Sequence, residues 1–415
     1  MKALYISYDG LTEPLAESQI LPYIRGLSRK GVAFTLLTFD KKAYLREFHR
    51  VRRLQEQLKL DGINWVRLIY HKRPYVFSSV YDILRGFFVS VGICLKDKIK
   101  VVHSRSYIAG LIGMNLSRMF GIKHIFDMRG LWADEKVDAG LWRKKGILYK
   151  TFKYFEKRLL LSADEVVVLT YKMKWLLENF TYLKSKAIRI TVIPTCVDLE
   201  KFKQIDGKSG LKQKYNLKEK FIFTYSGSIG TVYMLKELLE LFKVSKELIP
   251  NSHLLILTHA DRQRIIDTSK SCGLNGADLT ILRVQHEDIV NWLTLSDVGI
   301  AFYKPTYSAI GRSPTKLWEY LACGLVVLVN SGVGDCNQII KSNRVGIIVE
   351  GFSSDDYKKT MHRLKGLLLD LEGFKCRCQN MLRKDFSLQR GIEGYLSIYK
   401  RLSKGEKRTQ LAAQD

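Results

Sequence analysis

A chain of 415 residues with 46% hydrophobic side chains is too long for one ordinary core and too apolar for a disordered protein, so two globular domains are expected. Its seven cysteines are scattered, which argues against a disulfide framework or a zinc knuckle and favours reduced thiols in a cytoplasmic protein. The net charge of +27 attracts phosphate, whether in nucleic acid, in lipid head groups or in an anionic substrate.

The first half of the chain alternates short apolar stretches, typical of strands, with stretches of helical periodicity. Strands are expected at 3–8, 32–39, 63–70, 100–106, 123–130, 165–170 and 189–198, and helices at 17–31, 51–60, 78–95, 106–120, 144–162 and 172–180. This alternation predicts a parallel, doubly wound sheet. No long apolar region precedes the first strand, so we expect no signal peptide. The stretch 76–95 carries Asp82 and Arg85 and is expected to be a poor membrane span.

A polar, lysine-rich stretch at 201–220 is expected to cross between domains, and a second alternating series follows it. Its strands are expected at 221–227, 253–258, 279–284, 298–303, 325–330 and 345–350, and its helices at 232–248, 261–272, 286–295, 314–323 and 335–342. We therefore expect an N-terminal domain at 1–200, a C-terminal domain at 201–385, and at 386–415 a helix that packs back on the N-terminal domain, then a polar tail. Ligands are expected at the carboxyl ends of the strands.

A glycine-rich turn in "TYSGSIGTVYMLKELL" is a candidate phosphate site. Gly227, Ser228, Gly230 and Thr231 lie between a predicted strand and a predicted helix, where free N–H groups suit a phosphate. The spacing matches neither a Walker A loop nor GxGxxG, and an ordinary turn is the alternative.

A second candidate lies in "SAIGRSPTKLWEYLACG", where Ser313 is expected to be an N-cap and Pro314 the first helical residue. Lys316 and Glu319 are three residues apart and share a helix face. Either they form a surface ion pair, or Glu319 faces a crevice and accepts hydrogen bonds from a ribose diol.

Five motifs in order resemble family 4 of the retaining glycosyltransferases, in particular bacterial enzymes of surface-polysaccharide biosynthesis. The motifs are "DGLTEPLAESQILPYIRGLS", "FDMRGLWADE", "VIPTCVDLEKF", "YSGSIGTVYMLKELL" and "SPTKLWEYLACGLVVLVNSGVGD", and the resemblance runs from about residue 2 to 400. It implies the GT-B fold, in which two Rossmann-like, doubly wound α/β domains face each other across a cleft. The C-terminal domain would bind a nucleotide-sugar, and the N-terminal domain an acceptor.

The resemblance implies which residues bind the donor. Glu319 matches the glutamate that holds the ribose, whereas Gly311 replaces the preceding glutamate, which contacts the donor sugar. The family's arginine and lysine after the glycine turn are missing too, so Arg312 or Lys316 is expected to supply the cation for the diphosphate. The donor-binding candidates are Gly227, Ser228, Gly230, Arg312, Ser313, Thr315, Lys316 and Glu319.

The resemblance also implies acceptor-binding and catalytic residues in the N-terminal half. The candidates in the acceptor or phosphate loop are Gly10, Glu17, Ser18 and Gln19, with helix capping as the alternative. Asp127 and Arg129 end a predicted strand where relatives carry a histidine facing the reacting sugar, and a structural ion pair is their alternative role. His103 is a third catalytic candidate, or a core histidine.

Retention in this family is usually explained by front-face attack, in which the departing diphosphate helps deprotonate the acceptor hydroxyl. The chain contains no Asp-x-Asp, so we expect a metal-independent enzyme with no metal site. No cofactor is expected beyond the nucleotide-sugar co-substrate, which is UDP- or GDP-linked.

The basic stretch 141–161 interleaves lysine and arginine with apolar and aromatic residues, which suits an anionic membrane surface. The stretch 72–92 is expected to add a second apolar contact, and a core helix with a solvated basic face is the alternative reading of the basic stretch. Because such glycosyltransferases commonly act on polyprenyl-diphosphate-linked saccharides, we expect a peripheral protein on the cytoplasmic face of the cell membrane.

Three other functions are alternatives to glycosyl transfer. A nucleic-acid-binding protein would explain the charge, but the sequence shows no zinc knuckle, RNP-like motif or helix-turn-helix, so no nucleic-acid partner is expected. A nucleotide-sugar 2-epimerase would need the donor site but no membrane-facing surface. A nicotinamide-dependent dehydrogenase is disfavoured because the first turn, "YDGLTEPLAES", lacks the glycine fingerprint.

Overall fold

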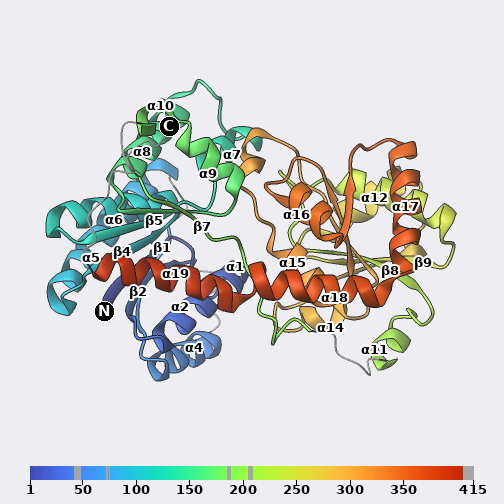
Figure 1. Cartoon of the computed structure of the whole chain (residues 1–415), viewed down its shortest axis with the longest axis horizontal. Helices are drawn as coiled ribbons and strands as arrows, with labels where there is room; N and C mark the ends of the chain where they lie inside the picture. The colour runs from blue at the N-terminus through green and yellow to red at the C-terminus, as the bar shows by residue number, and fades with distance from the viewer. Residues whose placement is uncertain (42–47, 72, 74, 185–187, 204–208, 405–415) are drawn as a thin grey trace. The chain divides into compact units, whose positions relative to one another are not determined.

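The computed structural model describes residues 1–41, 48–71, 73, 75–184, 188–203 and 209–404. The chain divides into two compact units, each an α/β domain (Figure 1). Unit 1 contains 1–137, 141–194 and the chain from 391 onward, and unit 2 contains 138–140 and 195–390. The main boundary therefore falls between Pro194 and Thr195, a few residues before the expected 200/201 division.

The sheet of unit 1 has seven parallel strands in the order β3-β2-β1-β4-β5-β6-β7. They are β1 Lys2–Ser7, β2 Ala33–Asp40, β3 Asn64–Ile69, β4 Val101–Arg105, β5 Lys123–Asp127, β6 Glu165–Val168 and β7 Ile190–Val192. The register pairs Ser7 with Arg105 and Arg105 with Asp127, so three strand ends lie side by side at the carboxyl edge. The order reverses between β1 and β4, the place where doubly wound sheets bind ligands.

The helices of unit 1 follow the expected alternation. They are α1 Pro14–Gln19, α2 Leu21–Arg29, α4 Phe48–Leu60, α5 Tyr75–Asp97, α6 Ser106–Phe120, α7 Trp132–Asp138, α8 Ile147–Ser162, α9 Tyr171–Glu178, α10 Thr181–Lys184 and α19 Leu388–Ser403. The single helix expected at 17–31 is instead two helices that break at Ile20. Pro22 lies in the first turn of α2, where its missing N–H has no helical partner to lose.

Helix α5 is long and apolar enough to cross a membrane by length and composition, over Phe77–Asp97, and it is the one such helix in the described part of the chain. Within unit 1 it packs against α6, β1 and β2. Its Asp82 is buried and accepts hydrogen bonds from the Tyr8 hydroxyl at 3.0 Å and the His71 amide at 2.9 Å. The opposite face leaves Phe77 and Phe88 exposed. Helix α5 is thus part of the α/β layer, with one apolar face uncovered.

The sheet of unit 2 has six parallel strands in the order β10-β9-β8-β11-β12-β13, which reverses between β8 and β11. The strands are β8 Phe221–Ser226, β9 Ser252–Leu257, β10 Leu279–Leu282, β11 Val298–Ala301, β12 Val326–Asn330 and β13 Gly346–Val349. The helices are α11 Ser209–Lys214, α12 Leu235–Leu248, α13 Arg262–Ser271, α14 Ile289–Leu293, α15 Thr315–Ala322, α16 Cys336–Asn343, α17 Ser354–Leu368 and α18 Leu371–Met381. Shorter helical turns occupy Gly276–Asp278, Tyr307–Gly311 and Leu382–Phe386.

The lysine-rich stretch at 201–220, expected to be the domain crossing, belongs to unit 2 in its described part. Phe202 and Leu217 are buried in the core of that unit, and Leu211 packs against it. The apolar side chains among the lysines therefore anchor the stretch, and 204–208 lie outside the described residues. The polar tail expected near 415 lies outside them from 405 onward.

Candidate functional site

The most unusual side chain of unit 2 is Lys316, in the first turn of α15. Its ammonium lies over the rings of Tyr225, Tyr233 and Tyr303, at 4.2, 4.7 and 5.7 Å from their centroids. The nitrogen is buried and, within the described residues, has no hydrogen-bond partner. Because three aromatic faces attract a cation but accept no conventional hydrogen bond, the ammonium keeps its donors for a ligand.

Burial lowers the pKa of Lys316 to about 7, against the opposing effect of the Glu319 carboxylate. An ammonium with this pKa is only partly charged at neutral pH and becomes fully charged when an anion binds beside it. The surface ion pair between Lys316 and Glu319 considered from the sequence is wrong, because both groups are buried and no direct contact joins them in the described structure.

The glycine turn after β8 lies against Lys316. A Cβ atom at Gly227 would stand 2.8 Å from the lysine nitrogen, and the φ angles of Gly227 and Gly230 are +123° and +139°, which disfavour other residues. The Gly227 amide donates to the Leu257 carbonyl at 2.9 Å and is not free. Among the described residues, the amides of Ser228 and Gly230 donate to no protein group. Two N–H groups and one ammonium therefore remain available at the turn.

The sequence pattern predicts that this turn lies at a helix N-terminus, and this prediction is wrong. Helix α12 begins only at Leu235, because Tyr233 first forms an antiparallel bridge with Tyr303. The phosphate site at this edge therefore depends on the loop amides and Lys316 and gains little from the helix dipole, which acts within the first turn.

Glu319 lies one turn after Lys316 on α15 and is 7% exposed. Its Oε1 is 3.6 Å from Nε2 of His286, and the other ring nitrogen of His286 lies 3.0 Å from the Lys201 ammonium. His286 thus lies beside the Glu319 carboxylate, and Lys201 lies beside the other side of the His286 ring. Both escaped the sequence reasoning, because they come from loops more than 30 residues away from Glu319 and match no motif.

The loop before α15 contributes a second cation. The Arg312 guanidinium lies 5.2 Å from the Tyr303 centroid, and its buried Nη1 has no hydrogen-bond partner in the described structure. Gly311, where the family resemblance predicts a glutamate, is buried. Tyr303 thus contacts the cations of both Arg312 and Lys316.

The sequence predicts Ser313 as the N-cap of α15, and this prediction is wrong. The cap position is Pro314, and Thr315 begins the helix. The Ser313 hydroxyl instead accepts from the Thr195 amide at 3.3 Å, and its carbonyl accepts from the Thr195 hydroxyl at 2.8 Å. These bonds join the loop before α15 to Thr195, where the 195–390 segment of unit 2 begins. The Ser313 hydroxyl therefore already has a hydrogen-bond partner within the protein.

In unit 1 the structure brings together Asp127, Arg129 and His103 at the carboxyl edge of the sheet. Asp127 accepts a hydrogen bond from the Tyr395 hydroxyl of α19 at 3.0 Å. Nη1 of Arg129 lies 3.8 Å from its Oδ1, and Nε2 of His103 lies 3.9 Å from its Oδ2. Burial alone would raise the pKa of Asp127, but Arg129, His103 and Arg105 together lower it to about 2. The carboxylate is therefore ionised at every ordinary pH.

Two further residues complete this cluster, Arg105 and Gln19. Nη1 of Arg105 lies 3.7 Å from Oδ2 of Asp127. The Gln19 side-chain oxygen accepts hydrogen bonds from Arg105 at 2.8 Å and from Arg129 at 2.7 Å. Sequence reasoning missed Arg105, although alternation along a strand puts residues two apart, such as His103 and Arg105, on one face.

Backbone strain marks Arg129. Its φ angle is +63°, a left-handed conformation that costs a non-glycine residue on the order of 1 kcal/mol and concentrates at functional sites. Its side chain remains 16% accessible, whereas those of Arg105 and Asp127 are nearly inaccessible. Arg129 is therefore the charged member of the cluster most able to touch a ligand.

His103 is 2% exposed and its Nδ1 lies 2.8 Å from the Tyr399 hydroxyl of α19. Burial lowers the pKa of His103, despite the opposing hydrogen bond and charge of Asp127, so the ring is neutral. The structure thus places His103 between the core and the Asp127 cluster.

The loop residues predicted to contact the acceptor have different surroundings. Gly10 packs against Asp40, whose Oδ1 would lie 2.6 Å from a Cβ at this position. Glu17 pairs with Arg50, and the Ser18 hydroxyl donates to the Leu15 carbonyl at 3.2 Å. Of the loop candidates, the described contacts join only Gln19 to the Asp127 cluster. Among the described residues, no group of three or more metal-binding side chains is present.

Comparison with known proteins follows the division into two units. Residues 208–366 match the family model "Glycosyl transferases group 1", and residues 16–201 match the model "Glycosyltransferase Family 4". A UDP-Gal:alpha-D-GlcNAc-diphosphoundecaprenol alpha-1,3-galactosyltransferase from Escherichia coli is 24% identical over 312 residues, covering 73% of this chain and 76% of that protein.

Solved structures with the same fold cover nearly the whole chain. Sucrose-phosphate synthase from Thermosynechococcus elongatus has a TM-score of 0.71 at 16% identity, covering 98% of this chain and 100% of that one. Anabaena HepE in complex with UDP and glucose has a TM-score of 0.67 at 12% identity, covering 97% and 100%. The chain therefore belongs to the glycosyltransferases of GT-B fold, with a family 4 domain in its first half and a group 1 domain in its second.

Proposed function

We propose that this enzyme transfers a sugar from a UDP-linked donor to a saccharide carried on polyprenyl diphosphate, with retention and without a metal, in cell-surface polysaccharide biosynthesis. The observation that carries the proposal is the unpaired Lys316 ammonium against the Gly227 turn, one helical turn from the buried Glu319. This arrangement offers a cation and amides to a diphosphate and a carboxylate to a ribose. The similar Escherichia coli enzyme uses UDP-Gal and a diphosphoundecaprenol-linked acceptor, which makes UDP-Gal the first donor to test.

Unit 2 is assigned the donor because its free groups complement the nucleotide. The ammonium of Lys316 and the amides of Ser228 and Gly230 point toward diphosphate oxygens, where charge-assisted hydrogen bonds are strong. Glu319, supported by His286, accepts hydrogen bonds from the two ribose hydroxyls. Arg312 takes over sugar or phosphate contacts in place of the glutamate that Gly311 replaces.

The proposed chemistry needs little from the protein except charge stabilisation and positioning. The bond between the anomeric carbon and the UDP oxygen breaks, and the acceptor oxygen bonds to that carbon on the same face. The acceptor proton passes to the departing diphosphate oxygen, so no protein base is required. Lys316 and the turn amides stabilise the negative charge that develops on the diphosphate.

Unit 1 is assigned the acceptor. The accessible side of Arg129 binds an anionic or hydroxyl group of the acceptor, and Asp127 acts as a positioning residue that holds Arg129 and Arg105. Gln19 fixes both guanidiniums from the other side. This role for Asp127 differs from direct contact with a sugar hydroxyl, because the carboxylate is only 1% exposed.

A thermal-shift screen tests the donor assignment. UDP-Gal and related UDP-sugars are expected to raise the melting temperature more than GDP- or dTDP-sugars, since only a ligand of the native state stabilises it. Glu319→Ala should weaken the UDP-sugar affinity at least tenfold, because hydrogen bonds to a charged group contribute roughly 1.5–3 kcal/mol. Glu247→Ala, an exposed glutamate of α12, is the matched control. Equal shifts for all nucleotides, or an unchanged affinity in Glu319→Ala, would contradict the assignment.

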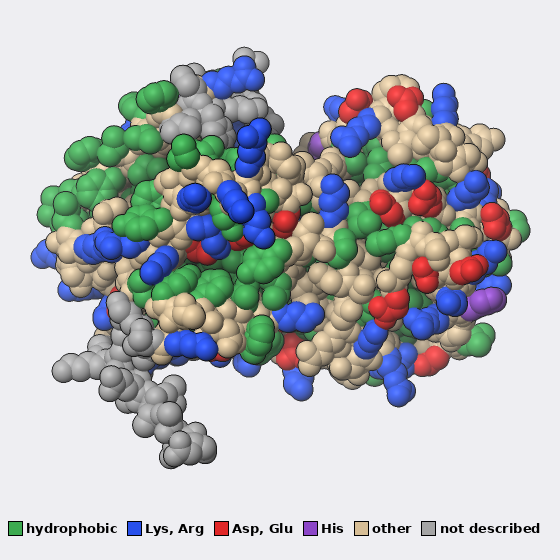
Figure 2. Space-filling model, turned by 90° about the horizontal axis from the view of Figure 1, so that it is seen from above, with side chains coloured by type: hydrophobic (Ala, Val, Ile, Leu, Met, Phe, Trp, Pro, Cys, Tyr) green, Lys and Arg blue, Asp and Glu red, His purple; other side chains and the backbone are tan. Residues whose placement is uncertain are grey.

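We also propose peripheral binding of unit 1 to the cytoplasmic face of the membrane. Around α8, Leu141, Ile147 and Tyr154 are exposed. The accessible basic residues beside them are Arg143, Lys144, Lys145, Lys150 and Arg158. Figure 2 shows hydrophobic areas interspersed with lysine and arginine on the unit that carries these residues.

Not every basic residue of the 141–161 stretch is available to lipid. Lys153 pairs with Asp134 at 3.1 Å and with the buried Glu156, and the Lys157 ammonium lies 5.0 Å from the Tyr182 centroid. Helix α8 also begins at Ile147, so Arg143 to Lys145 lie in the preceding turn.

Sedimentation with phosphatidylglycerol vesicles tests the membrane proposal. Binding should weaken as salt rises, and Lys144→Ala with Lys145→Ala should weaken it about 30-fold at low salt, because each basic residue contributes about 1 kcal/mol near the surface. The exposed pair Lys358→Ala and Lys359→Ala in α17 serves as the control and should change little. Indifference to anionic lipid would remove the basis for this proposal.

A further inference from the structure

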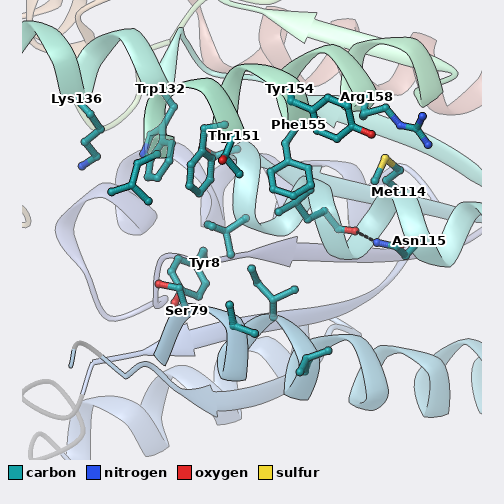
Figure 3. Close-up of a pocket in the computed structure, with 18 of the residues that line it drawn as sticks. Tyr8, Ser79, Met114, Asn115, Trp132, Lys136, Thr151, Tyr154, Phe155 and Arg158 are labelled. Atoms are coloured by element: carbon teal, nitrogen blue, oxygen red, sulfur yellow. Dashed lines mark hydrogen bonds between the residues drawn. The ribbon is translucent and has the colours of Figure 1, made fainter. Parts of the chain in front are cut away.

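A groove of about 780 Å³ runs through unit 1. Helix α6 forms its floor, and α5 and α8, which both pack on α6, form its walls. Figure 3 shows Trp132, Thr151 and Phe155 on one side, facing Tyr8 and Ser79 on the other. The groove is therefore concave and enclosed on three sides, unlike the outer face of α5.

The groove starts at the carboxyl edge of the sheet. Tyr8 and Asp9 follow β1, and Ser106, which also lines the groove, follows β4. From Ser106 the floor continues along α6 to Arg118, a distance of about 18 Å at 1.5 Å per helical residue. One end of the groove thus lies at the carboxyl edge of the sheet, and the other end lies at Arg118, near the end of α6.

The chemistry of the lining is apolar along the groove and basic at both ends. Ile83, Leu111, Met114 and Phe155 line the interior, while Val80 and Leu84 are half exposed at the rim. The basic lining residues are Lys136, Arg118, Arg158 and Lys41, of which Lys41 pairs with Glu13, and the one acidic lining residue is Asp9. Figure 3 shows Lys136 and Arg158 at opposite ends of the row of aromatic side chains.

Helix α8 is held in place by buried polar contacts, so the groove is formed without a ligand. The Tyr107 hydroxyl of α6 donates to Glu156 at 2.5 Å, and the Tyr149 hydroxyl donates to Asp134 at 2.8 Å. Lys153 bridges Glu156 and Asp134. A preformed apolar groove of this volume is in the range of small-molecule sites, roughly 300–1,000 Å³.

We propose that this groove binds the first isoprene units of the acceptor's polyprenyl chain, with the lipid diphosphate at the end lined by Tyr8 and Lys136. The inference rests on the proposed function, since it concerns the lipid part of the same acceptor. An isoprenoid diphosphate joins an anionic head to a narrow apolar chain, which matches the basic end and the apolar length of the groove. A bilayer surface presents a broad face and cannot fill a groove enclosed on three sides.

Calorimetry with farnesyl diphosphate, farnesol and inorganic pyrophosphate, in the absence of vesicles, tests this inference on the full-length enzyme. Farnesyl diphosphate should bind at least tenfold more tightly than either fragment, because only it occupies both the basic end and the apolar length. Thr151→Trp places a large ring into the groove and should weaken farnesyl diphosphate binding at least tenfold. Met119→Trp, on an exposed part of α6 outside the lining, should leave it unchanged.

Vesicle and donor measurements on the same variants separate the possible outcomes. Unchanged vesicle sedimentation and UDP-sugar affinity in Thr151→Trp, together with a raised KM for a lipid-linked acceptor, would support the inference. If Thr151→Trp no longer sediments with vesicles and the wild-type enzyme binds no farnesyl diphosphate, then this surface contacts the membrane and the groove inference is overturned. If the wild type transfers sugar to the lipid-linked acceptor and Thr151→Trp keeps its KM, the groove proposal fails while the proposed function stands. Absence of UDP-sugar binding in the wild type would instead refute the function.

Discussion

Lys316→Met is expected to weaken the binding of UDP-sugar by about 10- to 150-fold, because a charge-assisted hydrogen bond contributes roughly 1.5–3 kcal/mol. Methionine fills similar space among Tyr225, Tyr233 and Tyr303 but offers neither charge nor a donor. Titration calorimetry measures the change directly. Lys304→Met, which alters an exposed lysine in the same unit, should leave the affinity unchanged.

The pH dependence of the wild type gives a second signature of Lys316. Its pKa is lowered to about 7 by burial, and the diphosphate binds its charged form. The affinity for UDP-sugar should therefore fall by up to about tenfold for each pH unit above 7, whereas that of Lys316→Met should stay flat. UDP-sugar is the suitable probe, since its diphosphate carries no terminal phosphate that titrates in this range.

As the pH rises above 7, the contribution of Lys316 to the stability of the unbound protein should increase, whereas the affinity for UDP-sugar should decrease. With a folded pKa of about 7 and an unfolded pKa of about 10.4, Lys316 binds more protons in the unfolded chain between these values, so its contribution to stability rises with pH. Lys316→Met removes the cost of burying the charge and should not lower the melting temperature at pH 7. A lower melting temperature with unchanged UDP-sugar affinity would show that Lys316 only supports the fold.

Asp127→Asn is expected to lower the transfer rate at least 100-fold while leaving UDP-sugar affinity unchanged. The substitution keeps the size of the side chain but removes the charge that faces Arg105 and Arg129. Two buried guanidiniums then lose their counter-charge, which should lower the free energy of unfolding by about 2–3 kcal/mol. Steady-state transfer assays and UDP-sugar titrations separate the two effects.

Acid titration distinguishes the charge of Asp127 from its hydrogen bond. The folded pKa of about 2 lies below the unfolded value, so the stability that Asp127 contributes is present above about pH 4 and lost as the pH falls toward 2. Asp127→Asn should lack this loss. Tyr395→Phe keeps the charge and removes one hydrogen bond, and should cost about 0.5–1.5 kcal/mol with most transfer activity kept. Full turnover by Asp127→Asn would leave Asp127 without a role in the reaction.

The strands and the class of fold were predictable because they depend on local periodicity. Each expected strand of both series is present, since buried parallel strands are continuous apolar runs between helix-length segments. Details that depend on the backbone in three dimensions were not predictable. Helix α12 begins at Leu235 because Tyr233 forms an isolated bridge with Tyr303, 70 residues away, and the helix expected at 17–31 breaks at Ile20.

The site residues divide in the same way. Glu319 and Asp127 were identified because each lies in a motif that resembles a known family, whereas Arg105 lies in none of these motifs and was missed. No local pattern could place Lys316 among three tyrosines from β8, the segment after β11 and the loop between β8 and α12. Nor could it bring Gln19 to two arginines that lie 86 and 110 residues away in the chain.

The sequence by itself determined two α/β domains, the glycine turn after β8 and the positions of the two acidic residues, because hydrophobic periodicity and turn chemistry act between near neighbours. Tertiary structure alone decided that the Lys316 ammonium lacks a hydrogen-bond partner among the described residues, that Asp127 lies beneath two arginines, and that α5 and α8 leave an apolar groove over α6. The physical reason is that desolvation, ion pairing and concavity arise from groups that the fold brings together across long separations in the chain.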